Sequence, residues 1–144
     1  MEKFYDKGLC FECNKCSNCC RHSGYVFLSE NDIKQIATAL NMTQDAFTRK
    51  FCKSVIGSGE VRISFIEQTS GDCVFYSQEI KGCGIYNSRP LQCKLYPFWE
   101  HLVTNVSEWN EEKKTCPGLD CGKRYSKKEI EEHLIKRRLD PIIK

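Results

Sequence analysis

Apolar residues in the first half of the chain recur at helical spacing. The first such face is formed by Ile33, Ile36, Ala37 and Leu40. These positions follow the i, i+3, i+4, i+7 pattern of a helix that packs on one side. Ser29 is placed to cap the first turn, with Asp32 three residues on in a capping-box arrangement. The pattern therefore predicts a helix that starts after Ser29 and ends at Asn41.

A second helix is predicted directly afterwards. Thr43 is its expected cap, and apolar residues then recur every four positions, at Phe47, Phe51 and Val55. Two successive helices with a short connection predict a helix hairpin, which Gly57 and Gly59 would close.

The middle of the chain has strand character. Residues 61–66, VRISFI, are rich in β-branched and aromatic side chains, which favour a strand. The turn sequence TSGD follows, so residues 73–76, CVFY, are expected to pair back as a second strand. A further short strand is predicted within residues 101–109, HLVTNVSEW.

Two more helices are predicted towards the C-terminus. Pro90 suits the first position of a short helix, and Pro97 would stop it within two turns. Ser126 with Glu129 opens a C-terminal helix over 126–139, which contains Ile130, Leu134 and Ile135. The elements together predict a small α+β protein with one domain over residues 1–144. It would combine a helix hairpin, a short antiparallel sheet and irregular loops organised around a cysteine metal cluster.

Composition and charge narrow the function. The 144 residues carry 22 basic and 19 acidic side chains, and a net charge of +3 is too balanced to indicate nucleic-acid binding. No apolar run approaches the roughly 18 residues that cross a membrane. The charged N-terminus MEKFYDKGL lacks the apolar region of a signal peptide, which predicts a cytoplasmic protein with reduced thiols. Eleven cysteines are also an odd number, which disfavours a closed disulfide framework.

The cysteine spacing indicates a metal site. Residues 10–20, CFECNKCSNCC, place five cysteines within eleven positions. Zinc takes four thiolates, iron–sulfur clusters also take four, and soft sulfur ligands disfavour magnesium and calcium. The adjacent pair Cys19–Cys20 does not converge easily on one atom, so distant cysteines are candidates as well: Cys73, Cys83, Cys93 and Cys116. Eight thiols suffice for two four-coordinate sites or one larger cluster, and both arrangements stay open.

Other candidate ligands have simpler interpretations. His22 and His101 could each replace a sulfur in a mixed site, but the first suits a polar surface loop and the second an aromatic packing surface. Cys52 follows Phe51 in the predicted second helix and is expected to pack as a small hydrophobe. Cys10 lies near the terminus, and Cys121 is a spare ligand at most.

Four motifs together carry a family resemblance. CNKCSNCC, CVFY, CGIYNSRPLQCKLYPF and CPG resemble the CxxCxxCC family of YkgJ-type cysteine-cluster proteins, described as zinc- or iron-chelating domains. The resemblance runs from about residue 13 to residue 118. It implies eight metal ligands, the same set as above: Cys13, Cys16, Cys19, Cys20, Cys73, Cys83, Cys93 and Cys116. Ser17 and Asn18 stand where relatives often carry a glycine, which bears on the shape of this loop.

Arg89 and the nearby aromatic residues are expected to surround the site. A guanidinium near several thiolates would offset their charge and donate hydrogen bonds to sulfur; the alternative is a surface arginine that caps a turn. The aromatic residues are expected to form a dry wall: Tyr86, Tyr96, Phe98 and Trp99.

Three functions follow from these features. The first is a metal-binding protein that holds zinc or iron on thiolates. The second, implied by the resemblance, is an iron–sulfur oxidoreductase or an accessory subunit of a protein-modifying, methylase-like enzyme. The third is a thiol redox protein that uses Cys19 and Cys20 directly. The chain has neither a G-x-G-x-x-G nor a P-loop motif, and it shows no site for the methyl donor of a methylase, which a protein partner could supply. Metal binding is therefore favoured. Zinc and iron both suit all-sulfur ligands, and whether the protein is an enzyme stays open.

Overall fold

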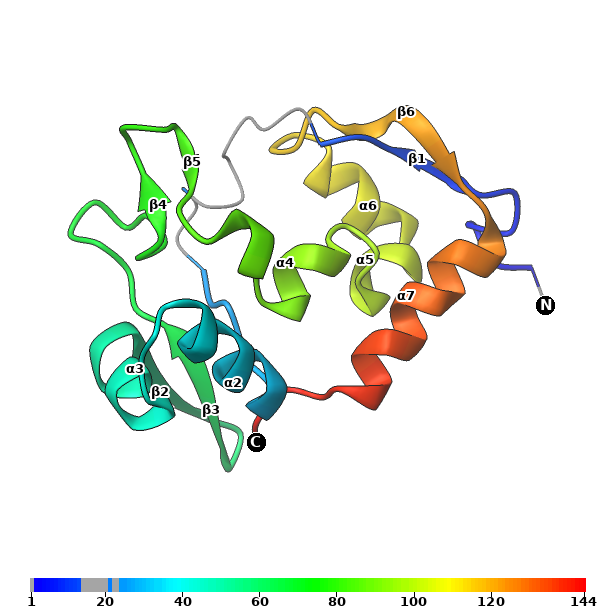
Figure 1. Cartoon of the computed structure of the whole chain (residues 1–144). Helices are drawn as coiled ribbons and strands as arrows, with labels where there is room; N and C mark the ends of the chain where they lie inside the picture. Colours follow the sequence, from blue (N-terminus) through cyan, green and yellow to red (C-terminus); the bar gives the residue numbers. More distant parts are fainter. Residues whose placement is uncertain (1, 14–20, 22–23) are drawn as a thin grey trace. The chain divides into compact units, whose positions relative to one another are not determined.

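The computed structural model describes residues 2–13, 21 and 24–144 (Figure 1). Its residue contacts define two compact units. Unit 1 comprises Met1–Asn18 and Leu95–Leu139, and unit 2 comprises Cys19–Lys94 and Asp140–Lys144. The elements are short helices and two-stranded antiparallel sheets, which confirms the predicted α+β class. One domain over residues 1–144 stays a prediction.

Unit 2 begins with the predicted helix pair. Helix α2 (Glu30–Ala39) carries the expected capping box, in which Ser29 and Asp32 each bind the other's backbone N–H group. Helix α3 (Gln44–Phe51) starts at the expected cap, because the Thr43 hydroxyl accepts the Ala46 N–H group. The apolar faces of both helices pack in one buried cluster, which includes Leu28, Ile36, Phe47 and Phe65.

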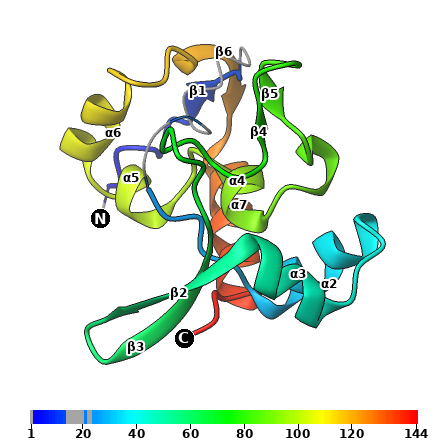
Figure 2. The same cartoon turned by 90° about the vertical axis from the view of Figure 1, so that its left-hand side faces the viewer.

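The second helix is shorter than predicted, and the end of the helix hairpin was placed wrongly. Residues Cys52–Gly57 form strand β2, which pairs with β3 (Glu60–Phe65), so Val55 lies opposite Arg62 in a β-ribbon (Figure 2). Ser58 and Gly59 both have positive φ angles, 51° and 75°. Two such residues form the hairpin turns that match the twist of paired strands. The β-branched residues of both segments therefore pair with one another instead of extending α3.

The predicted strand 73–76 pairs differently from the expectation. The main partner of 61–66 is β2, and Cys73 forms only a single bridge, with Glu67. Strand β4 (Tyr76–Ser77) instead pairs with β5 (Gly82–Cys83) in a small hairpin. A 3₁₀ turn, η1 (Tyr86–Ser88), leads to helix α4 (Leu91–Leu95), which starts directly after Pro90 and ends before Pro97, as predicted.

Unit 1 is built around an antiparallel ladder of distant segments. Strand β1 (Leu9–Phe11) pairs with β6 (Leu119–Tyr125), and Figure 1 shows the two side by side. Helices α5 (Glu100–Val103), α6 (Val106–Glu112) and α7 (Lys127–Leu139) complete the unit.

Two expectations for unit 1 can be compared with the structure. The predicted strand at 101–109 is wrong, because α5 and α6 occupy it and the Asn105 side chain caps the second of them. The C-terminal helix is confirmed: Ser126 and Glu129 form its capping box. Ile130 is buried in it, whereas Ile135 is 47% exposed.

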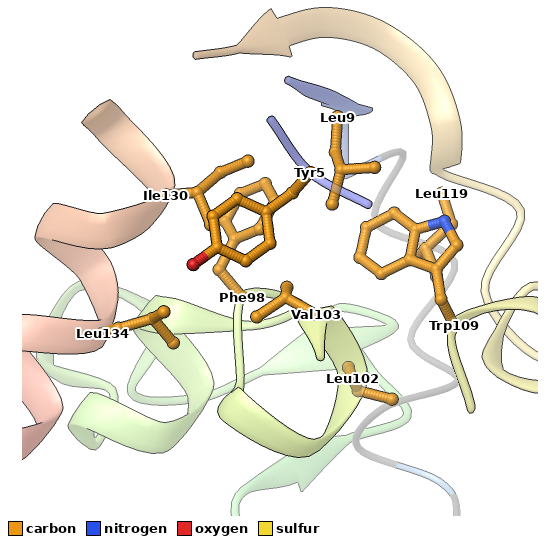
Figure 3. Close-up of a cluster of buried hydrophobic side chains, with 9 residues drawn as sticks. All are labelled: Tyr5, Leu9, Phe98, Leu102, Val103, Trp109, Leu119, Ile130 and Leu134. Carbon is orange, nitrogen blue, oxygen red and sulfur yellow. The ribbon is translucent and has the colours of Figure 1, made fainter. Parts of the chain in front are cut away.

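The core of unit 1 gathers aromatic and aliphatic side chains from every one of its elements. Figure 3 shows these residues: Tyr5, Leu9, Phe98, Leu102, Val103, Trp109, Leu119, Ile130 and Leu134. Burial of this apolar surface provides the main favourable free energy for the unit. Among the described residues, no helix has the length and hydropathy needed to cross a bilayer.

Candidate metal centre

The structure describes five of the eight predicted ligands: Cys13, Cys73, Cys83, Cys93 and Cys116. Cys13 is exposed and the other four are half-buried. The other three predicted ligands, Cys16, Cys19 and Cys20, lie outside the described residues. His22 lies outside them as well.

In unit 1, the β1–β6 ladder places the segment of Cys13 beside the segment of Cys116. Phe11 is paired with Leu119, and the Glu12 N–H group donates to the Gly118 carbonyl at 3.2 Å. A Cβ atom on Gly118 would lie only 2.2 Å from the Glu12 carbonyl oxygen. The absence of a side chain at Gly118 therefore permits the close approach that sets the two segments together.

In unit 1, Glu112 is hydrogen-bonded to both Cys116 and Tyr96. The Cys116 N–H group donates to the Glu112 carbonyl at 3.0 Å, as the last turn of α6 closes. The Tyr96 hydroxyl donates to Glu112 Oε2 at 2.5 Å. Burial raises the pKa of Tyr96, and hydrogen bonds to Glu112 and to the Cys116 side chain raise it further. Tyr96 thus keeps its proton, which it donates to the Glu112 carboxylate.

In unit 2, Tyr76 connects the segments of Cys73 and Cys83. The Tyr76 N–H group donates to the Cys73 carbonyl at 2.9 Å, and Tyr76 is paired with Cys83 in the β4–β5 ladder. Both cysteines also pack against the buried cluster of unit 2. The guanidinium of Arg21, the residue after Cys20 in the sequence, lies 5.6 Å from the centre of the Tyr76 ring.

Arg89 joins the η1 turn to the segment of Cys93. Its guanidinium lies 4.0 Å from the centre of the Tyr86 ring, and its Nε donates to the Tyr86 carbonyl at 3.0 Å. Its Nη1 donates to the Cys93 carbonyl at 3.4 Å. These contacts hold the turn from η1 into α4. A role of Arg89 toward the thiolates stays a prediction.

The other candidate residues lie in different surroundings. Cys52 is half-buried in the cluster of unit 2, as a small hydrophobe would be, although it starts β2 instead of lying in a helix. Burial raises its pKa to about 11. Cys10 lies in β1, and Cys121 is exposed in β6. His101 is exposed, with its ring 5.9 Å from that of Trp99.

The described donors are consistent with a soft metal but do not by themselves complete a site. Within residues 2–13, 21 and 24–144, no three Cys, His, Asp or Glu side chains are gathered closely enough to hold a metal ion. The chain brings the described cysteine segments together in pairs, and all of their donor atoms are sulfur. This chemistry suits zinc and iron and is unsuited to magnesium or calcium.

Comparison with known proteins identifies the family. The sequence model of the CxxCxxCC family, whose description is "Putative zinc- or iron-chelating domain", matches residues 12–117. The chain belongs to the CxxCxxCC family. This confirms the resemblance inferred from the four motifs, and metal chelation is the function that the family description gives.

One curated relative of this CxxCxxCC protein is the uncharacterized protein MJ0661 of Methanocaldococcus jannaschii. It is 29% identical over 94 residues, which cover 65% of this chain and 48% of the relative. The chain therefore spans about half the length of the curated relative that it matches. No solved structure matches this chain.

Sequence reasoning missed the contacts of Tyr96. Glu112 precedes Cys116 by four residues, and this helical spacing could have placed the two together. Tyr96 was expected only in an apolar wall, because a hydroxyl contact across 16 residues leaves no local pattern in the sequence.

Proposed function

We propose that this protein binds zinc or iron through cysteine thiolates. The ligand set is the eight cysteines of the family motifs: Cys13, Cys16, Cys19, Cys20, Cys73, Cys83, Cys93 and Cys116. A bound metal would supply a cross-link between distant parts of the chain, and the thiolates would be kept reduced in a compartment such as the cytosol.

The observation that supports the proposal is the backbone pairing of segments that carry these cysteines. In unit 1, a backbone hydrogen bond joins Glu12, which precedes Cys13, to Gly118, which lies two residues after Cys116. In unit 2, the Tyr76 N–H group donates to the Cys73 carbonyl, and Tyr76 is paired with Cys83 in the β4–β5 ladder. Cys13 and Cys116 are about 100 residues apart in the sequence, whereas Cys73 and Cys83 are ten residues apart and are joined through a short hairpin; Cys52 lies outside the family motifs. A four-thiolate site needs cysteines from separate segments to be brought together by the fold.

The experiment is to measure metal content and the visible absorption spectrum of protein purified without oxygen. Zinc in colourless protein, or iron with the absorption of a thiolate complex, would each support the proposal. Acid-labile sulfide together with iron would identify an iron–sulfur cluster. A folded protein that contains neither metal would contradict it.

A matched pair of variants tests the ligand set. Cys83 and Cys52 are both half-buried and both pack against the cluster of unit 2, but only Cys83 belongs to the family motifs. We expect Cys83→Ser to reduce the metal content of the purified protein and Cys52→Ser to retain it. Equal metal content in the two variants would remove Cys83 from the ligand set.

A further inference from the structure

The Gln68 side chain holds the turn that carries Cys73. Its Nε2 group donates to the Cys73 carbonyl at 2.9 Å and to the Tyr76 carbonyl at 2.8 Å. The backbone of Gln68 closes the preceding loop, because its N–H group donates to the Asp72 carbonyl at 2.7 Å and its carbonyl accepts the Gly71 N–H group at 2.8 Å. Gln68 thus organises the chain as far as Tyr76 with both its backbone and its side chain.

The same turn places Cys73 near strand β5, which carries Cys83. The Tyr76 N–H group donates to the Cys73 carbonyl at 2.9 Å, and the Cα atoms at the two ends of such a four-residue turn lie less than about 7 Å apart. Tyr76 is paired with Cys83 across β4 and β5 (Figure 1), and paired residues of antiparallel strands have Cα atoms about 4.5–5.5 Å apart. Both cysteines are half-buried and pack against the cluster of unit 2. One hairpin therefore presents two family cysteines.

The backbone of Cys73 is fixed from two sides. Its carbonyl accepts hydrogen bonds from Gln68 Nε2 and from the Tyr76 N–H group, which uses both lone pairs of the oxygen. Cys73 also forms a β-bridge with Glu67, the residue before Gln68. The amide of Gln68 is the side chain that joins Cys73 to Tyr76, and through Tyr76 to the strand of Cys83.

We propose that Gln68 is a positioning residue for Cys73 and Cys83: its amide holds the hairpin so that both thiolates bind the same metal ion. This inference rests on the proposed function and assigns two of its ligands to one site. A thiolate site of zinc takes four ligands, so the hairpin would supply half of them. Groups that orient metal ligands change metal affinity by about 10- to 100-fold when they are removed. Gln68 acts on the backbone of Cys73 instead of its sulfur, so we expect the lower end of this range.

Gln68→Met removes both donors and keeps the length of the side chain. The Cys73 carbonyl still accepts the Tyr76 N–H group in this variant, so the turn is retained. Thr43→Ala is the matched control, because the Thr43 hydroxyl also binds a backbone group at an exposed position of unit 2. The helix that Thr43 caps carries no family cysteine. The difference between the two variants isolates the effect on the hairpin.

The first test compares wild type, Gln68→Met and Thr43→Ala in two measurements. Zinc affinity is measured by competition with a chelator. The absorption of the Co²⁺-loaded protein reports the ligand field apart from the stability of the metal-free chain. We expect Gln68→Met to weaken zinc binding by about 10-fold and to shift the Co²⁺ bands. Thr43→Ala should match wild type in both measurements, although its Tm is lower.

The second test asks whether the two thiolates share a metal ion. We expect Cys73→Ser, Cys83→Ser and the double variant to lose the same amount of zinc per chain. In the Cys73→Ser background, Gln68→Met should have no further effect on the zinc that remains bound. A Gln68→Met effect that persists in this background would show that Gln68 acts on another part of the protein.

The results that would overturn the inference are distinguishable from a failure of the proposed function. If wild type takes up none of zinc, iron and cobalt, the proposed function fails, and the role of Gln68 fails with it. If wild type binds zinc and cobalt but Gln68→Met changes only the Tm, the proposed function stands and the positioning role is wrong. If the double cysteine variant loses twice as much zinc as each single variant, the two thiolates serve different metal ions and their assignment to one site is wrong.

Discussion

The thiol of Cys52 lies half-buried against the apolar cluster of unit 2, and this burial raises its pKa from 9.0 to about 11. The raised value keeps the thiol neutral under ordinary conditions, so it reacts slowly with alkylating reagents, which attack the thiolate. Cys52 is therefore an internal reference for a cysteine with a structural role. The alkylation rates of the family cysteines can be compared with the rate of Cys52.

The pKa of Cys52 predicts a specific pH dependence. Because the folded protein holds this proton more tightly than the unfolded chain, the contribution to stability is complete below pH 9.0 and is lost as the pH rises through about 11. We expect the alkylation rate of Cys52 to rise with a midpoint near pH 11, and the alkaline loss of stability to be smaller in Cys52→Ser. An alkylation midpoint near 9.0, the ordinary value, would show that burial does not control this thiol.

At the level of elements, Asp32 connects the start of α2 to the start of α4. One carboxylate oxygen accepts the Ser29 N–H group and the other accepts the Leu91 N–H group, both at 3.0 Å. Asp32 is buried, so its removal leaves two backbone donors without their partner in the interior of unit 2. The helix that carries Cys93 is thus held in part by the cap of another helix.

We expect Asp32→Ala to lower the free energy of unfolding by about 2–4 kcal/mol, the sum of a lost cap and an unsatisfied buried donor. Thr43→Ala is the control, because Thr43 caps α3 with a single exposed contact. It should cost about 1 kcal/mol. Urea unfolding of both variants measures the difference. Equal losses would show that the bond to Leu91 contributes nothing.

The close approach of Gly118 to the Glu12 backbone leads to a second prediction at the level of elements. A Cβ atom there would collide with the Glu12 backbone, so Gly118→Ala should force β1 away from the segment of Cys116. We expect a loss of about 1–3 kcal/mol in the free energy of unfolding, together with weaker metal binding. Gly57→Ala is the control, since no atom lies within 4 Å of its Cβ position. A Gly118→Ala protein with unchanged metal affinity would contradict the importance of this approach.

The sequence predicted the starts of elements better than their ends and partners. Ser29, Thr43 and Ser126 were identified as caps because a cap is a local pattern of polar residues. Val55 was assigned to a helix because it follows Phe51 at the four-residue spacing of a helix. Its pairing with Arg62, which is not a local feature of the sequence, places it in a strand. The capping role of Asn105 was missed for the same reason: the apolar pattern of HLVTNVSEW does not distinguish strand from helix.

At the level of the whole molecule, the family cysteines occur in both compact units. Unit 1 contains Cys13 and Cys116, and unit 2 contains Cys73, Cys83 and Cys93. The class of chemistry could be predicted from the motifs, because thiolate spacing is a property of the sequence. The division into two units could not be predicted from the sequence, because β1 and β6 pair across more than 100 residues and no local pattern indicates this pairing.

Metal removal tests how far the fold depends on these cysteines. Because a thiolate site forms only in the folded chain, binding energy becomes folding energy. A metal present at about 1,000 times its Kd adds about 4 kcal/mol of stability, which corresponds to about 10 °C or more in unfolding temperature for a chain of this size. We therefore expect a chelator, under reducing conditions, to lower the Tm of the wild-type protein by about 10 °C or more.

Two cysteine variants make this result specific. Cys16→Ala removes a family cysteine and should have a lower Tm than Cys52→Ala, with little further loss when the chelator is added. Cys52→Ala should still respond to the chelator as wild type does, because its metal ligands are intact. A wild-type protein whose Tm is unchanged by the chelator would mean that the apolar clusters of the two units suffice for folding, and the cysteines would then serve a metal that the fold does not need.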